Sequence, residues 1–167
     1  MERHMTVSGF VAHEGRVALH WHRKIGMWLP AGGHIEAGED PLEAAMREVR
    51  EEFAVEVEVM PITGRVQYQG GPRQIEPPYT ILDCWPEPEH CHVDHVYLFR
   101  LISGYPGLSH DPDYPILWLN AEELSSGSAT VHGQDVPFAP DVLALGLETI
   151  RQAERLATAT AAAPPRR

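Results

Sequence analysis

The sequence predicts one layered domain of the α/β or α+β class, in which helices cover a mixed β-sheet. Strand-like segments rich in β-branched and aromatic residues follow one another through short turns and through longer connections. Segments with helical periodicity lie between them, so sheet and helices are expected to share one core. The chain has 167 residues, which is enough for one well-buried core and too few for two ordinary domains.

The strand-like segments can be placed in order. Residues 6–22 carry apolar and aromatic residues on both sides of His13-Glu14-Gly15, which predicts two strands joined by a turn. The segment 23–34 contains Pro and Gly breakers and is expected to be a loop. The remaining strand candidates are residues 55–60 running on toward 64–69, then 79–85, 91–102 and 116–119.

Helical periodicity is found at about residues 41–53, in a short segment 120–124 that Asn120 is placed to cap, and from 139 to about 157. The segments 69–78 and 103–115 are turn-rich or polar connections. The final residues are mostly Ala, Thr and Pro and have nothing to bury. We therefore expect a single domain over residues 1–158 and a disordered tail over 159–167.

Composition excludes some classes of function. The formal net charge is −11, which disfavours binding to nucleic-acid polymers or anionic membranes. The apolar runs are far shorter than the roughly 20 residues needed to span a bilayer, and the N-terminus lacks the apolar region of a signal peptide. We expect a cytoplasmic protein whose Cys84 and Cys91 are reduced thiols.

The helix at 41–53 has a well-specified start and two distinct sides. Asp40 suits the N-cap, Pro41 the first helical position, and Glu43 can reach back to the cap. Its apolar side, expected to pack on the core, consists of Leu42, Ala45, Met46, Val49 and Phe53.

The acidic side of the same helix holds Glu48 and Glu52 one turn apart, with Glu51 on the more exposed surface between them. Arg47 can pair with Glu51 or with Glu43. Like charges one turn apart repel, and more so beside buried surface, so a hard divalent cation such as Mg²⁺ is a natural compensation. The alternative interpretation is a solvated acidic face on an ordinary helix.

The run GGHIEAGEDPLEAAMREVREEFAV, from Gly32 to Val55, resembles a known motif. Gly33, five residues, Glu39, seven residues and then Arg47-Glu48-Val49-Arg50-Glu51-Glu52-Phe53-Ala54-Val55 closely match the Nudix box. The departure is Ala54, where the family has Gly. Gly would end the helix in a left-handed conformation, in which Ala costs about 1 kcal/mol.

The resemblance implies an α/β/α sandwich and hydrolysis of a nucleoside diphosphate linked to another moiety, dependent on Mg²⁺ or Mn²⁺. It also implies roles for residues. The metal ligands are then Glu48, Glu52 and the Gly32 carbonyl, with Glu51 a further ligand or the group that helps to activate water. Arg47 orients the glutamates and Glu39 supports the loop. The expected partner is a small-molecule nucleoside diphosphate derivative, and a homodimer is compatible with the family. The alternative is a catalytically silent Nudix-fold module that binds nucleotides.

Other residues are candidates for substrate binding. Gly33 lets the backbone approach a phosphate. The run from His20 to Lys24, with His22 and Lys24 as the candidate contacts, places positive charge before the acidic run, although a solvated hairpin end is the simpler interpretation. On a strand, His92 and Asp94 share one side, opposite Val93 and His95.

The remaining candidates are weaker. The run His90 to His95, with Cys84 nearby, lacks the spacing of a standard zinc site, so sheet or pocket lining is favoured. Glu87 or Glu89 could supply another carboxylate, and Trp28, Tyr68 or Trp85 could stack on a base, although isolated aromatics are more often core. Substrate specificity is expected in the segments 69–78 and 103–115.

Overall fold

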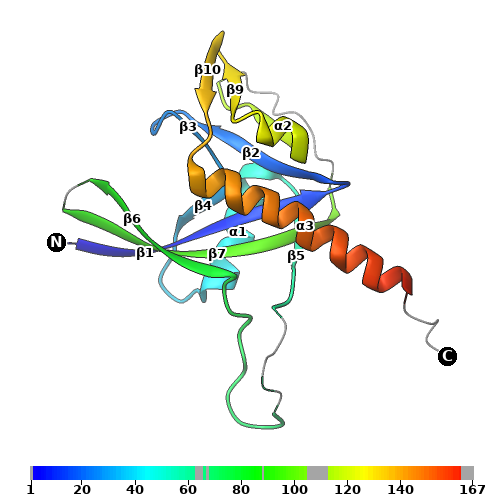
Figure 1. Cartoon of the computed structure of the whole chain (residues 1–167). Helices are drawn as coiled ribbons and strands as arrows, with labels where there is room; N and C mark the ends of the chain where they lie inside the picture. Colours follow the sequence, from blue (N-terminus) through cyan, green and yellow to red (C-terminus); the bar gives the residue numbers. More distant parts are fainter. Residues whose placement is uncertain (1, 63–65, 67, 88, 105–112, 163–167) are drawn as a thin grey trace.

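A computed structural model describes residues 2–62, 66, 68–87, 89–104 and 113–162. Within them, a mixed sheet has one helix on each face, with a further short helix at its edge (Figure 1). This arrangement confirms the layered α+β class expected from the sequence. Among these residues, no helix is both long and apolar enough to cross a lipid bilayer.

The strands of the main sheet are β1 (Glu2–His13), β2 (Arg16–His22), β3 (Met27–Leu29), β4 (Ala31–His34), β5 (Glu56–Val59), β6 (Thr80–Glu87), β7 (His90–Ser103) and β8 (Ile116–Asn120). A separate hairpin consists of β9 (Ser128–Val131) and β10 (Gln134–Pro137). The helices are α1 (Pro41–Phe53), α2 (Ala121–Ser125) and α3 (Pro140–Ala162).

The long strands β1 and β7 lie side by side and parallel at the centre of the sheet, in register from Glu2↔His90 to Ala12↔Arg100. The other pairings among the described strands are antiparallel. Strands β2 and β4 pair with successive parts of the outer edge of β1, and β5 and β6 pair with successive parts of the outer edge of β7. Strand β4 pairs with the middle of β1 through Thr6↔His34 and Gly9↔Ala31. This pairing holds the glycine-rich segment beside the sheet centre.

Alternation along the central strands sends successive side chains to opposite faces and so builds two cores. Val7, Val11 and Phe99 are buried with Val49 and Phe53 of α1. On the opposite face, residues of both central strands are buried with residues of α3: Phe10, Val96, Leu98, Val142 and Ile150. The apolar side predicted for residues 41–53 therefore faces the sheet.

Helix α1 begins and ends as its sequence requires. The Asp40 side chain accepts hydrogen bonds from the backbone amides of Leu42 and Glu43, each at 3.0 Å, and the Glu43 carboxylate accepts one from the Asp40 amide. Ala54 ends the helix in the left-handed conformation, with φ 54°, and its amide donates to the Arg50 carbonyl at 3.1 Å. Ala54 thus adopts the conformation that glycine usually has at this position, and its backbone is strained because it carries a Cβ atom.

Several expectations need correction. The segment 23–34 is not a plain loop, because it contains β3 and β4, which tertiary pairing stabilises despite the glycines. The hairpin β9–β10 was not predicted. Helix α3 continues through Ala162, so the expected tail is helical at 159–162, while 163–167 lie outside the described residues. The same is true of 63–65, 67 and 105–112, and therefore of much of the strand continuation at 64–69 and of the loop at 103–115.

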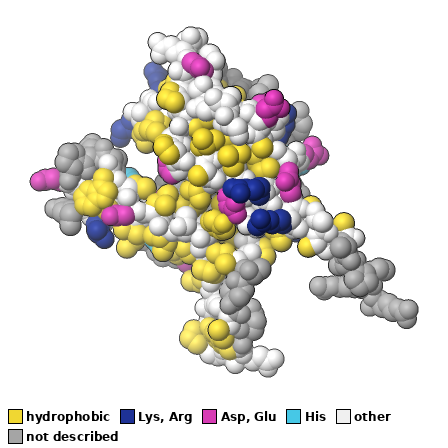
Figure 2. All heavy atoms as spheres, viewed as in Figure 1, with side chains coloured by type: hydrophobic (Ala, Val, Ile, Leu, Met, Phe, Trp, Pro, Cys, Tyr) yellow, Lys and Arg dark blue, Asp and Glu magenta, His cyan; other side chains and the backbone are white. Residues whose placement is uncertain are grey.

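The face that carries α3 mixes apolar side chains with charges of both signs (Figure 2). Arg151 and Glu148 of α3, for example, form an ion pair at 3.0 Å.

Candidate active site and metal centre

Arg47, in the middle of α1, gathers the acidic residues that surround it. Its Nε and Nη2 atoms donate to the two carboxylate oxygens of Glu39, at 2.8 and 3.1 Å. Nη1 donates to Glu48 at 2.8 Å and to Glu51 at 3.3 Å, and Nη2 also donates to the backbone carbonyl of His34 at 3.1 Å. A planar guanidinium can hold several acceptors in fixed directions. Arg47 therefore ties the loop before α1 to the acidic side of the helix.

This network has electrostatic consequences for its members. The hydrogen bond from Arg47 holds the pKa of Glu39 below its usual value, and the hydrogen bonds to Glu39 and Glu48 raise the pKa of Arg47. Of the two partners proposed for Arg47 from the sequence, the structure shows Glu51. The other, Glu43, is engaged at the helix cap.

Glu52 lies against β4. Its Oε2 atom accepts a hydrogen bond from the Gly32 amide at 3.0 Å, and its side chain is 25% exposed. Burial raises the pKa of Glu52 to about 7, with smaller contributions from the charges of Glu48 and Glu51, and the Gly32 hydrogen bond opposes the rise. A Cβ atom at Gly32 would lie 2.5 Å from the backbone oxygen of Val7, so this position admits only glycine without backbone movement.

Glu48 is packed in the same way against the next residue of β4. Its side chain is 13% exposed, and a Cβ atom at Gly33 would lie 2.2 Å from its Oε1. Strand β4 therefore holds the carboxylates of successive helical turns through a pair of adjacent glycines. Glu51, by contrast, is 59% exposed and points away from β4 toward Arg47 and solvent.

The donor set suits a hard divalent cation. Glu48 and Glu52 offer carboxylate oxygens, and Gly32 can add its carbonyl, which are ligands that Mg²⁺ and Mn²⁺ prefer. The raised pKa of Glu52 shows that its negative charge is poorly compensated by the protein alone. The residues present thus fit the ion that the Nudix resemblance implies.

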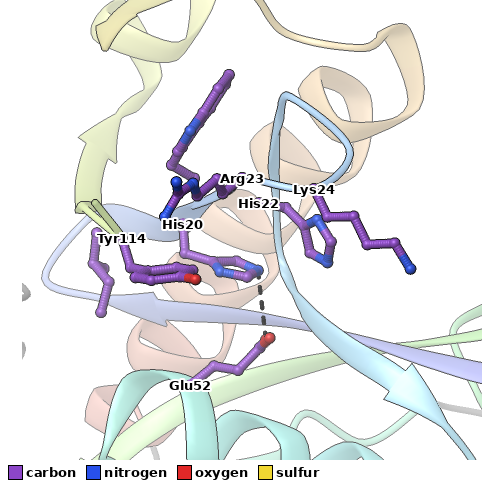
Figure 3. A pocket seen from close by; sticks show the side chains of 8 residues that line it. His20, His22, Arg23, Lys24, Glu52 and Tyr114 are labelled. Atoms are coloured by element: carbon purple, nitrogen blue, oxygen red, sulfur yellow. Dashed lines mark ion pairs between the residues drawn. The ribbon is translucent and has the colours of Figure 1, made fainter. Parts of the chain in front are cut away.

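His20, the first residue of the His20–Lys24 run, also belongs to this site, through a contact with Glu52 that the sequence did not predict. Its Nε2 lies 3.5 Å from Oε2 of Glu52, and the ring points toward that carboxylate (Figure 3). Burial lowers the pKa of His20 to about 4, and the nearby His22 contributes, so the contact is not an ion pair at neutral pH. The available signal was the alternation of β2, which puts His20 and His22 on one side of the strand.

A cavity of about 750 Å³ opens beside Glu52. Figure 3 shows His22 and Lys24 on one side of His20 and Tyr114 on the other, and Arg23 also lines the cavity. The remaining lining residues are Trp21 and Ile116. Basic side chains on the rim of an acidic centre are suited to hold a phosphate chain beside a bound cation.

A second cavity, of about 690 Å³, continues along β4. All the residues predicted to bind substrate line it: Gly33, His22, Lys24 and His92. Asp94 also lines it and accepts a hydrogen bond from the Thr6 hydroxyl at 2.9 Å. The two cavities are neighbours, because His22 and Lys24 line both of them.

Other candidates fare differently. Trp28 is 1% exposed and donates to the Ala129 carbonyl, so it is a core residue and cannot stack on a ligand. Tyr68 and Trp85 are exposed, and neither lines the two cavities described above. Glu89 is exposed, and the side chain of Glu87 lies outside the described residues.

Comparison with known proteins identifies the family to which this fold belongs. The NUDIX domain family model matches residues 2–142. A NUDIX family hydrolase from Clostridium perfringens is 26% identical, with TM-score 0.70, covering 92% of this chain and 99% of that one. A MutT NUDIX hydrolase from Burkholderia pseudomallei is 18% identical (TM-score 0.59, 89% and 98% covered), and a NUDIX hydrolase from Nitrosomonas europaea is 17% identical (TM-score 0.58, 92% and 90% covered). No curated protein sequence matches.

The fold and the acidic site define a hydrolase that acts on phosphoric anhydride bonds. The chain belongs to the NUDIX domain family. Both expectations drawn from the motif, the family and its fold, are thereby confirmed.

Proposed function

We propose that this protein is a pyrophosphohydrolase that uses Mg²⁺ or Mn²⁺ to cleave the diphosphate linkage of a nucleoside diphosphate joined to another moiety. One observation carries the proposal. Glu48 and Glu52, one turn apart and largely buried, are both held against the glycines of β4. Burying such a pair is unfavourable unless a cation compensates it.

In this proposal Glu48, Glu52 and the Gly32 carbonyl hold the ion. The bound ion supplies charge neutralisation at the phosphoryl oxygens and a lowered pKa of water. Arg47 fixes the direction of the Glu48 carboxylate, and Glu39 in turn fixes Arg47 through two hydrogen bonds. Glu51 is the exposed carboxylate of the group and is therefore the one best placed to accept a proton from an entering water.

We place the substrate in the two neighbouring cavities. His22 and Lys24 contact the phosphates, and Gly33 lets the backbone approach them. His92 lines the second cavity, which takes the part of the substrate beyond the phosphates. A small molecule is favoured over a nucleic-acid polymer because the net charge is −11.

The test is a substrate panel. Nucleoside triphosphates, sugar nucleotides and dinucleotides are incubated with the protein and Mg²⁺ or Mn²⁺, and phosphate is measured after a phosphatase step. We expect metal-dependent release with at least one class and none with EDTA. Tight nucleotide binding without turnover across the panel would instead establish the catalytically silent module.

A further inference from the structure

A cluster of histidines lies at the end of the second cavity, at the start of β1 and β7. The parallel register places Glu2 beside His90 and His4 beside His92. Since alternate residues of a strand share a face, all these side chains emerge on one side of the sheet. His34 of β4 adjoins them, with its ring centre 5.2 Å from that of His4.

The imidazoles are in close contact. The ring centres of His4 and His90 are 4.6 Å apart, as are those of His90 and His92. The Nε2 atoms of His90 and His92 are separated by 2.7 Å, a distance at which one ring donates a hydrogen bond to the other. Such a bond requires at least one neutral ring with a free lone pair, the form in which histidine binds metals.

One nitrogen of the cluster has no hydrogen-bond partner. Nε2 of His4 is buried and, among the described residues, makes no hydrogen bond. It lies 3.3 Å from Oε1 of Glu2, without the geometry of a hydrogen bond. Leaving a buried polar atom in this state is unfavourable, so a ligand that contacts it is expected.

We propose that Glu2, His4 and His90 form a binding site for a transition-metal cation, with Zn²⁺ the best fit, separate from the carboxylate centre on α1. The candidate ligand atoms of these three residues all lie within 4.8 Å of one another. Tetrahedral zinc with bonds of about 2.0–2.1 Å places its ligand atoms roughly 3.3 Å apart. The Glu2–His4 pair already has this separation. His90, whose ligand atom lies within 4.8 Å of the other two, would reach the cation by a change of side-chain rotamer.

The chemistry separates this site from the carboxylate centre. Imidazole nitrogens favour Zn²⁺, Ni²⁺ and Cu²⁺, whereas an all-oxygen set favours Mg²⁺ and Mn²⁺. His92, whose Nε2 lies 2.7 Å from that of His90, is the candidate for a fourth ligand. A cation here would clamp the first residues of β1 onto β7, where the backbone already contributes a hydrogen bond from the Glu2 amide to the Glu89 carbonyl at 3.1 Å.

The sequence by itself could not indicate this site. The run from His90 to His95 lacks zinc spacing, and the missing ligands come from β1, at the other end of the sequence. Only the parallel pairing of β1 with β7 brings Glu2 and His4 to His90.

The test is calorimetric titration of Zn²⁺ into the untagged full-length protein. The measurement is made in a Glu48→Gln/Glu52→Gln background, which removes the carboxylate centre. We expect about one Zn²⁺ per chain. His4→Ala and His90→Ala, added separately, should each weaken binding by at least roughly tenfold, the smallest effect of even an outer-shell change. Visible absorption of the Co²⁺-loaded protein should report a tetrahedral site in this background and lose intensity in the histidine variants.

The matched control is His132→Asn. His132 lies in the β9–β10 turn at φ 50°, which Asn tolerates, so this variant removes an imidazole without touching the cluster. Circular dichroism of each metal-free variant checks the fold, and His4→Gln serves if His4→Ala unfolds. Zinc affinity unchanged in the His4 and His90 variants would overturn the proposal, as would loss of binding on removal of the carboxylates alone. Neither result bears on hydrolysis at α1.

Discussion

Gly33 and Glu48 are in direct contact: a Cβ atom at Gly33 would lie 2.2 Å from Oε1 of the Glu48 carboxylate. Glu48 is also held by Arg47 at 2.8 Å, so it has little room to move aside. The packing of strand β4 against helix α1 thus determines the position of the Glu48 carboxylate as well as the charge around it.

We expect Gly33→Ala to displace the Glu48 carboxylate and lower kcat/KM by at least about tenfold, because a misplacement of about 1 Å reduces turnover strongly. The metal affinity should weaken in parallel, measured by Mn²⁺ titration. Gly38→Ala is the control for a nearby glycine, since a Cβ there meets nothing within 4 Å, although its φ of 94° strains the backbone. Full activity in Gly33→Ala would show that Glu48 is not held as described.

Glu52→Gln should abolish most turnover while leaving the fold intact. The amide keeps the shape and can still accept the hydrogen bond from Gly32, but it is a poor ligand for a hard cation. The expected loss in kcat is at least about 100-fold, read from phosphate release at saturating metal. Glu122→Gln, on the exposed surface of α2, should be indistinguishable from the parent protein. Near-normal rates in Glu52→Gln would remove the mechanism.

The same residue predicts a pH dependence of stability in metal-free protein. The pKa of Glu52 is about 7 in the folded state against 4.5 for an unperturbed glutamate, so between these values the folded state binds more protons than the unfolded state. The contribution of Glu52 therefore lowers the free energy of unfolding as pH rises from 4.5 to 7, by about 3 kcal/mol in all.

Urea unfolding in EDTA at several pH values measures this effect. Glu52→Gln should be more stable than the parent at pH 8, and the difference should vanish near pH 4.5. His20 acts in the opposite direction, because its lowered pKa removes stability as pH falls below 6.5 toward 4. Because His20 lies 3.5 Å from Glu52, comparing the two proteins reports Glu52 together with its coupling to His20. A difference independent of pH would contradict the burial argument.

Arg47→Lys should reduce turnover even though the charge is kept. Lysine is a point charge and cannot reproduce the two hydrogen bonds to Glu39 together with the one to Glu48. We expect kcat/KM to fall by about 10- to 100-fold, as for other residues that orient metal ligands. Arg50→Lys is the matched control on the same helix, since Arg50 binds Glu56 in a similar way on the exposed side. Equal effects of the two changes would argue against an orienting role for Arg47.

Ala54→Gly should stabilise the protein. Ala54 is left-handed at φ 54°, a conformation that costs an L-residue with a Cβ about 1–2 kcal/mol. Part of the gain is offset by the freedom glycine has in the unfolded chain, leaving about 0.5–1 kcal/mol. Calorimetry should show a melting temperature higher by about 1–4 °C. Ala157→Gly, on the exposed side of α3, should shift it downward.

Much of the site could be predicted because its signals are local. The cap at Asp40, the apolar stripe through Val49 and the turn-by-turn spacing of Glu48 and Glu52 follow from helical geometry within 15 residues. The motif at Gly33 to Val55 then indicated the family. Strand β4 escaped prediction because glycines have low strand propensity, and it forms through hydrogen bonds with β1.

The contacts that the sequence interpretation missed share one property: they join residues that are distant in the chain. His20 meets Glu52 only because β2 and α1 converge at the cavity. Glu2 and His4 meet His90 only because β1 and β7 pair in parallel. Parallel pairing requires a long connection, so no short-range pattern announces it.

The amino-acid sequence alone thus determined the acidic helix, its ends and the family to which the chain belongs, since these depend on contacts within one or two helical turns. The tertiary structure alone decided how far the carboxylates are buried, which glycine touches which glutamate, and which histidines lie together. Burial and proximity arise when strands far apart in the chain pack into one sheet, and they set both the pKa of Glu52 and the composition of the histidine cluster.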